Sequence, residues 1–249
     1  MSRLMLISNS KCYGQGYLDH CAKDIRDFLG QLNRVLFIPW AEPDLAEQPG
    51  YVEMVRARLA EIDLDVRGPH QFKSLTEALD RSDVIFVGGG NTFCLLDAIY
   101  TVDERDPVPG RLARMRLIRA KVKAGMPYIG TSAGSNLACP TCCTTNDMPI
   151  ITHPFSLDAL NLIPFQINPH YQGTDPESKH MGETRDDRIR EFHKLHSQRV
   201  IGLYEGSWLV VEGDKVFLRG NRGAKIFDKG AKPYSWPYAW NDEGMPIAD

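Results

Sequence analysis

The sequence predicts an α/β fold, with a mostly parallel sheet flanked by helices and a β-hairpin near the C-terminus. Short β-rich runs alternate with amphipathic helical stretches, which is typical of parallel strands joined by covering helices. Two later β-rich runs flank Gly213-Asp214, and this spacing predicts the hairpin. We expect the 249 residues to form a single domain, with residues 228–249 as an irregular C-terminal extension.

The first half of the chain is expected to alternate strand and helix. Apolar side chains recur at helical spacing over residues 17–32, which predicts one apolar helix face on the sheet. Ser74 followed by Glu77 has the spacing of a capping box at a helix start. Residues 42–50, rich in Pro, Glu and Asp, indicate a loop. The expected strands are 4–8, 34–40, 64–67 and 83–87, and the expected helices are 17–32, 52–62, 74–81 and one from residue 93.

The second half continues the same alternation. A helix over 112–123 leads to an apolar run before Ser132, and a loop over 144–153 follows the next helix. Residues 160–168 are expected to form a strand that ends at Pro169-His170. The remaining expected elements are a polar helix over 184–196, a strand over 200–204, hairpin strands over 208–211 and 216–218, and an irregular tail from Asp228.

Composition and charge restrict the kinds of partner that we expect. The 29 Lys and Arg side chains against 32 Asp and Glu give a formal net charge of -3, so neither a nucleic acid nor a membrane is an expected partner. The apolar run at residues 4–7 is too short for a signal sequence, and we expect a cytoplasmic protein. The six cysteines include a C-x-x-C spacing at Cys139 and Cys142 without a second pair, so we expect free thiols and no metal.

Ser132 has the sequence surroundings of a nucleophile elbow. It lies between Gly130 and Gly134, where a short apolar run meets small residues that can open a helix. A tight strand-to-helix turn strains its central residue, and flanking glycines remove the Cβ atoms that would collide. The N–H of Ala133, at the helix start, can then face an oxyanion formed by attack of the serine. This geometry favours acyl transfer.

A second glycine-rich segment, Gly88-Gly89-Gly90-Asn91-Thr92, follows the expected strand 83–87. It can be a plain turn, a phosphate cradle or an oxyanion loop. The spacing lacks the G-x-G-x-x-G and G-x-x-x-x-G-K patterns of nucleotide-binding loops. In α/β hydrolases a second oxyanion donor comes from a glycine-containing loop after another strand, so we favour the oxyanion loop.

A serine nucleophile needs a base, and His170 stands at the carboxyl end of an expected strand, where ligands of open α/β sheets bind. The histidine needs an acid to orient it. Asp147 preserves the chain order serine, acid, histidine, whereas Glu205 ends the strand 200–204 on the sheet edge expected for Ser132 and His170. The sequence leaves both acids open.

Together these segments resemble the peptidase E family, aspartyl dipeptidases with a serine nucleophile on a fold similar to class I glutamine amidotransferases. The segments that carry the resemblance are Ile7-Ser8-Asn9-Ser10, residues 87–93, 130–141 and 144–149, Ile167-Asn168-Pro169-His170, Gly182-Glu183-Thr184-Arg185 and Glu205-Gly206. The resemblance implies that Ser132 is the nucleophile, His170 the base and Asp147 or Glu205 the orienting acid. It also implies an oxyanion hole made by the Gly90 and Ala133 amides.

Substrate recognition is expected at Arg185, with Gly89 and Asn91 as further substrate-binding residues. A cation in the first turn of a helix opposes the helix dipole and needs an anion. Glu183, Asp186 or Asp187 can supply it, in which case Arg185 is structural. The resemblance favours the other interpretation, in which the guanidinium grips the side-chain carboxylate of a substrate aspartate.

The function expected from the sequence is hydrolysis of Asp-X dipeptides after an N-terminal aspartate, through an acyl-enzyme and with no cofactor. The partner is a small peptide substrate, and the sequence leaves the oligomeric state open. Two alternatives remain. A cyanophycinase-like or other acyl hydrolase on the same scaffold would keep the serine site and take another substrate. A catalytically silent amidotransferase-like protein would only bind its ligand.

Overall fold

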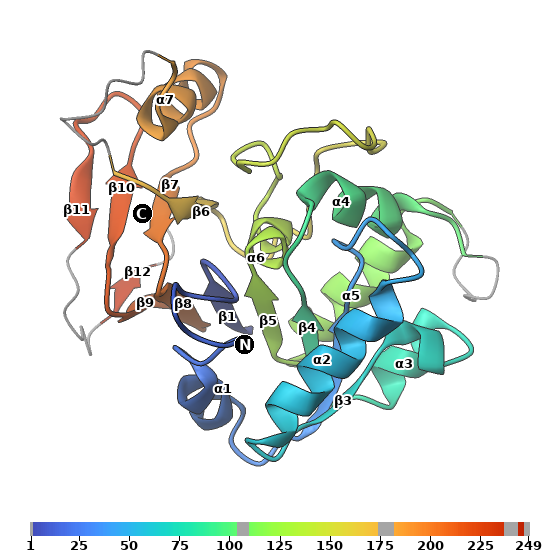
Figure 1. The fold of residues 1–249 in the computed structure, drawn as a ribbon. Coiled ribbons are helices and arrows are strands. Elements are labelled where there is room, and N and C mark those ends of the chain that lie inside the picture. Colours follow the sequence, from blue (N-terminus) through green and yellow to red (C-terminus); the bar gives the residue numbers. More distant parts are fainter. Residues whose placement is uncertain (1, 104–109, 174–181, 237–243, 247–249) are drawn as a thin grey trace.

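The computed structural model describes residues 2–103, 110–173, 182–236 and 244–246 (Figure 1). Their strands form two sheets, of eight strands in the order β12-β9-β8-β1-β5-β4-β2-β3 and of four strands in the order β11-β10-β7-β6. The α/β class with a mostly parallel main sheet is confirmed. In the described part of the chain, no helix has the length and apolarity needed to cross a membrane.

The centre of the main sheet is parallel. Its parallel strands are β1 (Arg3–Ile7), β2 (Arg34–Ile38), β3 (Asp65–Arg67), β4 (Val84–Val87) and β5 (Tyr128–Thr131). The expected hairpin is present as β8 (Ser207–Glu212) and β9 (Lys215–Gly220), and it extends this sheet because β8 pairs antiparallel with β1. The edge strand β12 (Met245–Pro246) pairs with β9.

Helices cover both faces of the main sheet. Alternation along β1 sends Met5 and Ile7 to one face and Leu4 and Leu6 to the other. The first face packs against α1 (Ala22–Leu29) and α2 (Gln48–Ala60), whose buried side chains belong to the same hydrophobic cluster. The helices α3 (Leu75–Asp80), α4 (Thr92–Tyr100), α5 (Ala113–Lys123) and α6 (Ala133–Ala138) cover the second face, and a short 3₁₀ turn, Pro69–Gln71, follows β3.

The second sheet carries the C-terminal part of the site. Its strands are β6 (Gln166–Tyr171), β7 (Val200–Tyr204), β10 (Ala224–Phe227) and β11 (Tyr234–Trp236). Between the parallel strands β6 and β7 the chain forms α7 (Arg185–Leu195), which packs on one face through Ile189. The other face joins the hydrophobic cluster of the main sheet, to which Ile167 and Ile201 contribute.

Three expected elements differ from the structure in their boundaries. The predicted helix 17–32 is shorter, because Lys11 bridges Tyr17 and Leu18 adopts φ 58°, so α1 begins at Ala22. The predicted loop 42–50 gives way to α2 at Gln48, since the first turn tolerates Pro49. The strand expected over 160–168 begins only at Gln166 and continues to Tyr171.

The tail is also more regular than expected. Residues 228–249 were predicted to be irregular, but β11 pairs with β10 and β12 pairs with β9. Hydrogen bonds to these two exposed strand edges order short segments that have no apolar period of their own. Residues 237–243 and 247–249 of the tail lie outside the described residues.

Candidate active site

Ser132 sits at a strained turn between β5 and α6. Its backbone has φ 51° and ψ −109°, a conformation that strains any residue with a Cβ atom. A Cβ atom at Gly130 would lie 2.5 Å from the carbonyl oxygen of Gly134, and one at Gly134 would lie 2.2 Å from that of Val87. Glycine is therefore required on both sides of the serine, as the elbow pattern predicts.

Ser132, His170 and Glu205 form a hydrogen-bonded chain. His170 Nε2 lies 3.0 Å from Ser132 Oγ, and His170 Nδ1 lies 2.7 Å from Glu205 Oε1. His170 adopts φ 52°, and its backbone N–H donates to Ser8 Oγ at 2.9 Å. Ser8 Oγ in turn donates to the carbonyl oxygen of Leu203 at 2.8 Å. The end of β1 thus fixes the turn of β6 that aims the imidazole at the serine.

The three side chains come from both sheets. Ser132 follows β5 of the main sheet, whereas His170 lies in β6 and Glu205 follows β7 of the second sheet. The expectation of one shared sheet edge was therefore wrong. Alternation of strands and helices along the sequence does not reveal that β6 and β7 leave the main sheet, because the pair is itself a parallel unit with a helical crossover.

Asp147 binds the start of α4. Its Oδ2 accepts hydrogen bonds from the backbone N–H of Thr92 at 2.7 Å and from the Thr92 hydroxyl at 2.6 Å. Both ring nitrogens of His170 face other groups, so the hydrogen bonds favour Glu205 over Asp147 as the acid beside the histidine. The neighbouring Asn146 Nδ2 donates to the carbonyl oxygen of Pro169 at 2.5 Å. This loop therefore links the start of α4 to the strand of His170.

The glycine segment after β4 passes beside the nucleophile. A Cβ atom at Gly89 would lie 3.2 Å from Ser132 Cβ. Gly90 adopts φ +138°, and a Cβ atom there would lie 2.4 Å from the carbonyl oxygen of Ala41. Only glycine fits this backbone. The N–H of Ala133 lies at the first position of α6, where helical N–H groups lack intrahelical partners.

Asn91, expected to bind substrate, also caps a helix through its side chain. Its side-chain oxygen accepts hydrogen bonds from the N–H groups of Phe93 and Cys94, both at 3.0 Å, and so caps α4. A substrate cannot use an oxygen that already caps a helix without releasing the cap, whose loss costs about 1 kcal/mol. The geometry thus indicates a structural function for Asn91, which a capping spacing before the apolar helix residues could have revealed.

Arg185 is the first residue of α7 and is half-buried. Its Nη1 atom is buried and has no hydrogen-bond partner among the described residues. Burial and the nearby charge of Arg188 lower the pKa of the Arg185 guanidinium, whereas its interactions with Glu205 and with the Tyr171 hydroxyl raise it. The contribution of Glu205 means that the guanidinium lies within electrostatic range of the acid that is hydrogen-bonded to His170.

The three acids expected to neutralise Arg185 are engaged by other groups. Asp186 accepts a hydrogen bond from the Tyr171 hydroxyl and pairs with Lys225. The carboxylate of Asp187 accepts from Thr184 in a capping box, and Glu183 lies 4.0 Å from a guanidinium nitrogen of Arg188. None of the three acids is therefore free to neutralise Arg185, as the structural interpretation of this residue requires. Tyr171 and Lys225 were missed, since only the tertiary fold brings them to α7.

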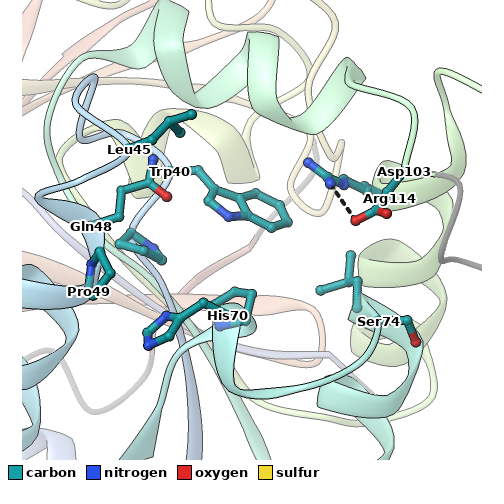
Figure 2. A pocket seen from close by; sticks show the side chains of 11 residues that line it. Trp40, Leu45, Gln48, Pro49, His70, Ser74, Asp103 and Arg114 are labelled. Atoms are coloured by element: carbon teal, nitrogen blue, oxygen red, sulfur yellow. Dashed lines mark hydrogen bonds and ion pairs between the residues drawn. The ribbon is translucent and has the colours of Figure 1, made fainter.

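Figure 2 shows a separate pocket at the carboxyl end of β2. The cavity has a volume of about 280 Å³, and Trp40 stands in its centre. The guanidinium carbon of Arg114 lies 4.7 Å from the centre of the Trp40 ring. Nη2 of Arg114 pairs with Asp103 at 2.9 Å. The Ser132, His170 and Glu205 side chains are not part of its lining.

The cysteines lie apart from this chemistry. All six are free, and Cys139 and Cys142 are buried. Burial raises the pKa of the Cys139 thiol to about 12 and that of Cys142 well above its ordinary value, so both stay protonated near neutral pH. Among the residues that the structure describes, no group of three or more His, Cys, Asp or Glu side chains is arranged to hold a metal ion.

A serine on a strand-to-helix turn, a histidine against it and a carboxylate behind the histidine are the arrangement of α/β hydrolytic enzymes. The family model of peptidase family S51 matches residues 4–219, and the chain belongs to this family of peptide-bond hydrolases. It is 46% identical over 230 residues to a peptidase E of Streptomyces coelicolor, covering 92% of this chain and 89% of the relative.

Other relatives agree with this membership. A probable alpha-aspartyl dipeptidase of Drosophila melanogaster is 41% identical over 226 residues, which cover 90% of this chain and 89% of that protein. A putative peptidase E from Listeria monocytogenes superposes with a TM-score of 0.62 at 24% identity, over 88% of this chain and 98% of that chain. A peptidase from an acI-B1 actinobacterium has a TM-score of 0.68 at 15% identity, over 99% and 97%. These two structural similarities concern the fold.

Proposed function

We propose that this chain is a serine-type dipeptidase that hydrolyses Asp-X dipeptides after an N-terminal aspartate. The observation that carries the proposal is the Arg185 guanidinium, whose Nη1 atom is buried and unpartnered among the described residues and which interacts electrostatically with Glu205, the acid hydrogen-bonded to His170. A cation that lacks an anion in the protein favours one on the ligand. The names of the relatives, peptidase E and probable alpha-aspartyl dipeptidase, support the same substrate.

In the proposed reaction Ser132 Oγ attacks the carbonyl carbon of the aspartyl residue while His170 Nε2 takes its proton. Glu205 accepts the Nδ1 hydrogen bond and stabilises the imidazolium that forms. The N–H groups of Gly90 and Ala133 face the oxyanion. Collapse breaks the peptide bond, and His170 gives its proton to the leaving amine. Water, deprotonated by His170, then hydrolyses the aspartyl ester and restores the serine.

Arg185 gives this reaction its substrate preference. The planar guanidinium can hold both oxygens of the aspartate side chain, and partial burial strengthens the interaction because water screens it less. Gly89 contributes backbone beside Ser132, where any side chain would crowd the substrate. Asn91 would contact the substrate through its Nδ2 donors, because its side-chain oxygen caps α4.

The test is hydrolysis of Asp-Leu and Leu-Leu by the purified protein, with and without a chelator and a serine-directed phosphonate or fluorophosphonate. We expect cleavage of Asp-Leu only, no effect of the chelator, and inactivation with the inhibitor attached to the Ser132 peptide by mass spectrometry. Attachment without Asp-Leu cleavage would favour another acyl hydrolase, such as the cyanophycinase-like alternative. Neither attachment nor cleavage would favour a silent binding protein.

A further inference from the structure

A largely buried polar cluster surrounds Asp186, the residue that follows Arg185 in α7. Lys225 of β10 pairs with Asp186 of α7 at 2.6 Å, and their side chains are only 23% and 14% exposed. The hydroxyl of Tyr171, on β6, donates to the other oxygen of Asp186. Two strands of the second sheet therefore hold one carboxylate in the first turn of α7.

Aromatic rings define the position of the lysine. Its Nζ lies 5.9 Å from the centre of the Tyr171 ring and 5.2 Å from that of Phe227. Cation–π contacts of this kind favour the ammonium in a partly dehydrated place. Burial, followed by the hydrogen bond to Asp186, raises the pKa of the Tyr171 hydroxyl, so it remains a donor. Lys225 is thus the cation that balances Asp186.

Asp186 is the immediate neighbour of Arg185, whose Nη1 is unpartnered within the described ranges. The Arg185 charge also acts on the Tyr171 hydroxyl, and this hydroxyl donates its hydrogen bond to Asp186, so Tyr171 connects the two residues. Partly buried charges interact through an effective dielectric constant of about 20, far below that of water. An uncompensated charge at Asp186 would therefore act on the neighbouring guanidinium and on an anion bound to it.

We propose that Lys225 is a positioning residue for substrate recognition, which compensates Asp186 and so keeps Arg185 available for the acidic side chain of the substrate. The inference rests on the proposed function, because it takes Arg185 as the group that receives this side chain. Without Lys225, the Asp186 carboxylate would compete for the guanidinium and repel the incoming carboxylate. With Lys225, the carboxylate serves only to anchor α7.

Two variants separate this role from a general contribution to the fold. Lys225→Met keeps an unbranched chain and leaves Asp186 without its cation. Adding Asp186→Asn removes the uncompensated charge, while the amide oxygen can still accept the hydrogen bond from Tyr171. Lys232→Met removes an exposed lysine between β10 and β11 and is the matched control.

The experiment measures KM and kcat for Asp-Leu, with thermal unfolding of each protein. We expect Lys225→Met to raise KM about 10-fold while kcat changes less than about 3-fold. Lys225→Met/Asp186→Asn should regain most of the affinity, Lys225→Arg should keep it, and Lys232→Met should match the wild type. A Lys225→Met variant that does not fold leaves the double variant and Lys225→Arg as the comparison.

Three results would overturn the inference. They are an unchanged KM in folded Lys225→Met, a double variant whose KM stays about 10-fold above that of the wild type, and equal effects of Lys225→Met and Lys232→Met. A wild-type protein that does not cleave Asp-Leu would instead refute the proposed function, and this inference with it. If the wild type cleaves Asp-Leu and the substitutions leave KM unchanged, the inference alone is refuted.

Discussion

Asp147 Oδ2 binds both the backbone N–H and the hydroxyl of Thr92, the first residue of α4. Thr92 is also the last residue of the glycine-rich segment beside Ser132, so this carboxylate anchors the segment to the loop after α6. A negative charge at a helix N-terminus is also favourable. Asp147 therefore has a structural reason to lie near the nucleophile without contacting the histidine.

Asp147→Ala should lower the free energy of unfolding by about 1–3 kcal/mol, because it leaves a partly buried N–H and hydroxyl without their acceptor. We also expect kcat to fall, since the glycine segment loses its anchor. Asp147→Asn keeps one acceptor oxygen and should recover part of both losses. Urea unfolding and Asp-Leu kinetics check this prediction. An alanine variant as stable as the wild type would show that Thr92 does not depend on Asp147.

Glu205→Gln should lower kcat without lowering stability. The Glu205 side chain is 51% exposed, so its loss should leave stability within about 0.5 kcal/mol. An amide cannot stabilise the imidazolium as a carboxylate does, and kcat should fall by about 10²- to 10⁴-fold. Glu212→Gln, at an exposed position at the end of β8, is the control. A kcat within a few-fold of the wild type would exclude Glu205 from the proposed triad.

Local sequence signals predicted most of the main sheet. The strands β1, β2, β4 and β7 lie close to their expected ranges, because strands buried on both faces appear as short continuous apolar runs. The same reasoning wrongly predicted a strand over residues 160–165. Leu160 and Ile163 are buried there without belonging to a strand, and an apolar run does not distinguish a packed loop from a strand.

The site was predictable to the extent that its geometry is local. The strained turn at Ser132 follows from two glycines that leave no room for a Cβ atom, and this constraint is visible in the sequence. The choice between Asp147 and Glu205 depends on how β6 and β7 meet β5 across two sheets, which no local spacing encodes. The Lys225 contact with α7 is likewise a product of tertiary packing.

The backbone at Ser132 predicts a difference between two inactive variants. Glycine adopts φ 51° and ψ −109° more easily than any residue with a Cβ atom, so Ser132→Gly should stabilise the protein by about 1 kcal/mol relative to Ser132→Ala. Both should lose kcat by about 10⁴-fold or more, because each lacks the nucleophile. Thermal unfolding and Asp-Leu hydrolysis test both points. Near-normal turnover by either variant would refute the serine mechanism.

Arg185→Ala should lower kcat/KM for Asp-Leu by about 30-fold or more, since loss of a partner to a buried carboxylate costs roughly 2–5 kcal/mol. Hydrolysis of the neutral analogue Asn-Leu should change much less. Arg185→Lys should recover only part of the activity, because an ammonium does not reproduce the two parallel bonds of a guanidinium.

Stability provides the second measurement for Arg185. Its Nη1 is buried and, in the parts of the chain that the structure describes, has no partner, so its removal should cost little unfolding free energy. Arg190→Ala, at a side chain 66% exposed on the same helix, controls for changes in helix propensity. Equal losses on Asp-Leu and Asn-Leu, accompanied by a large fall in stability, would mean that Arg185 serves the fold. The acidic preference would then have to come from another cation.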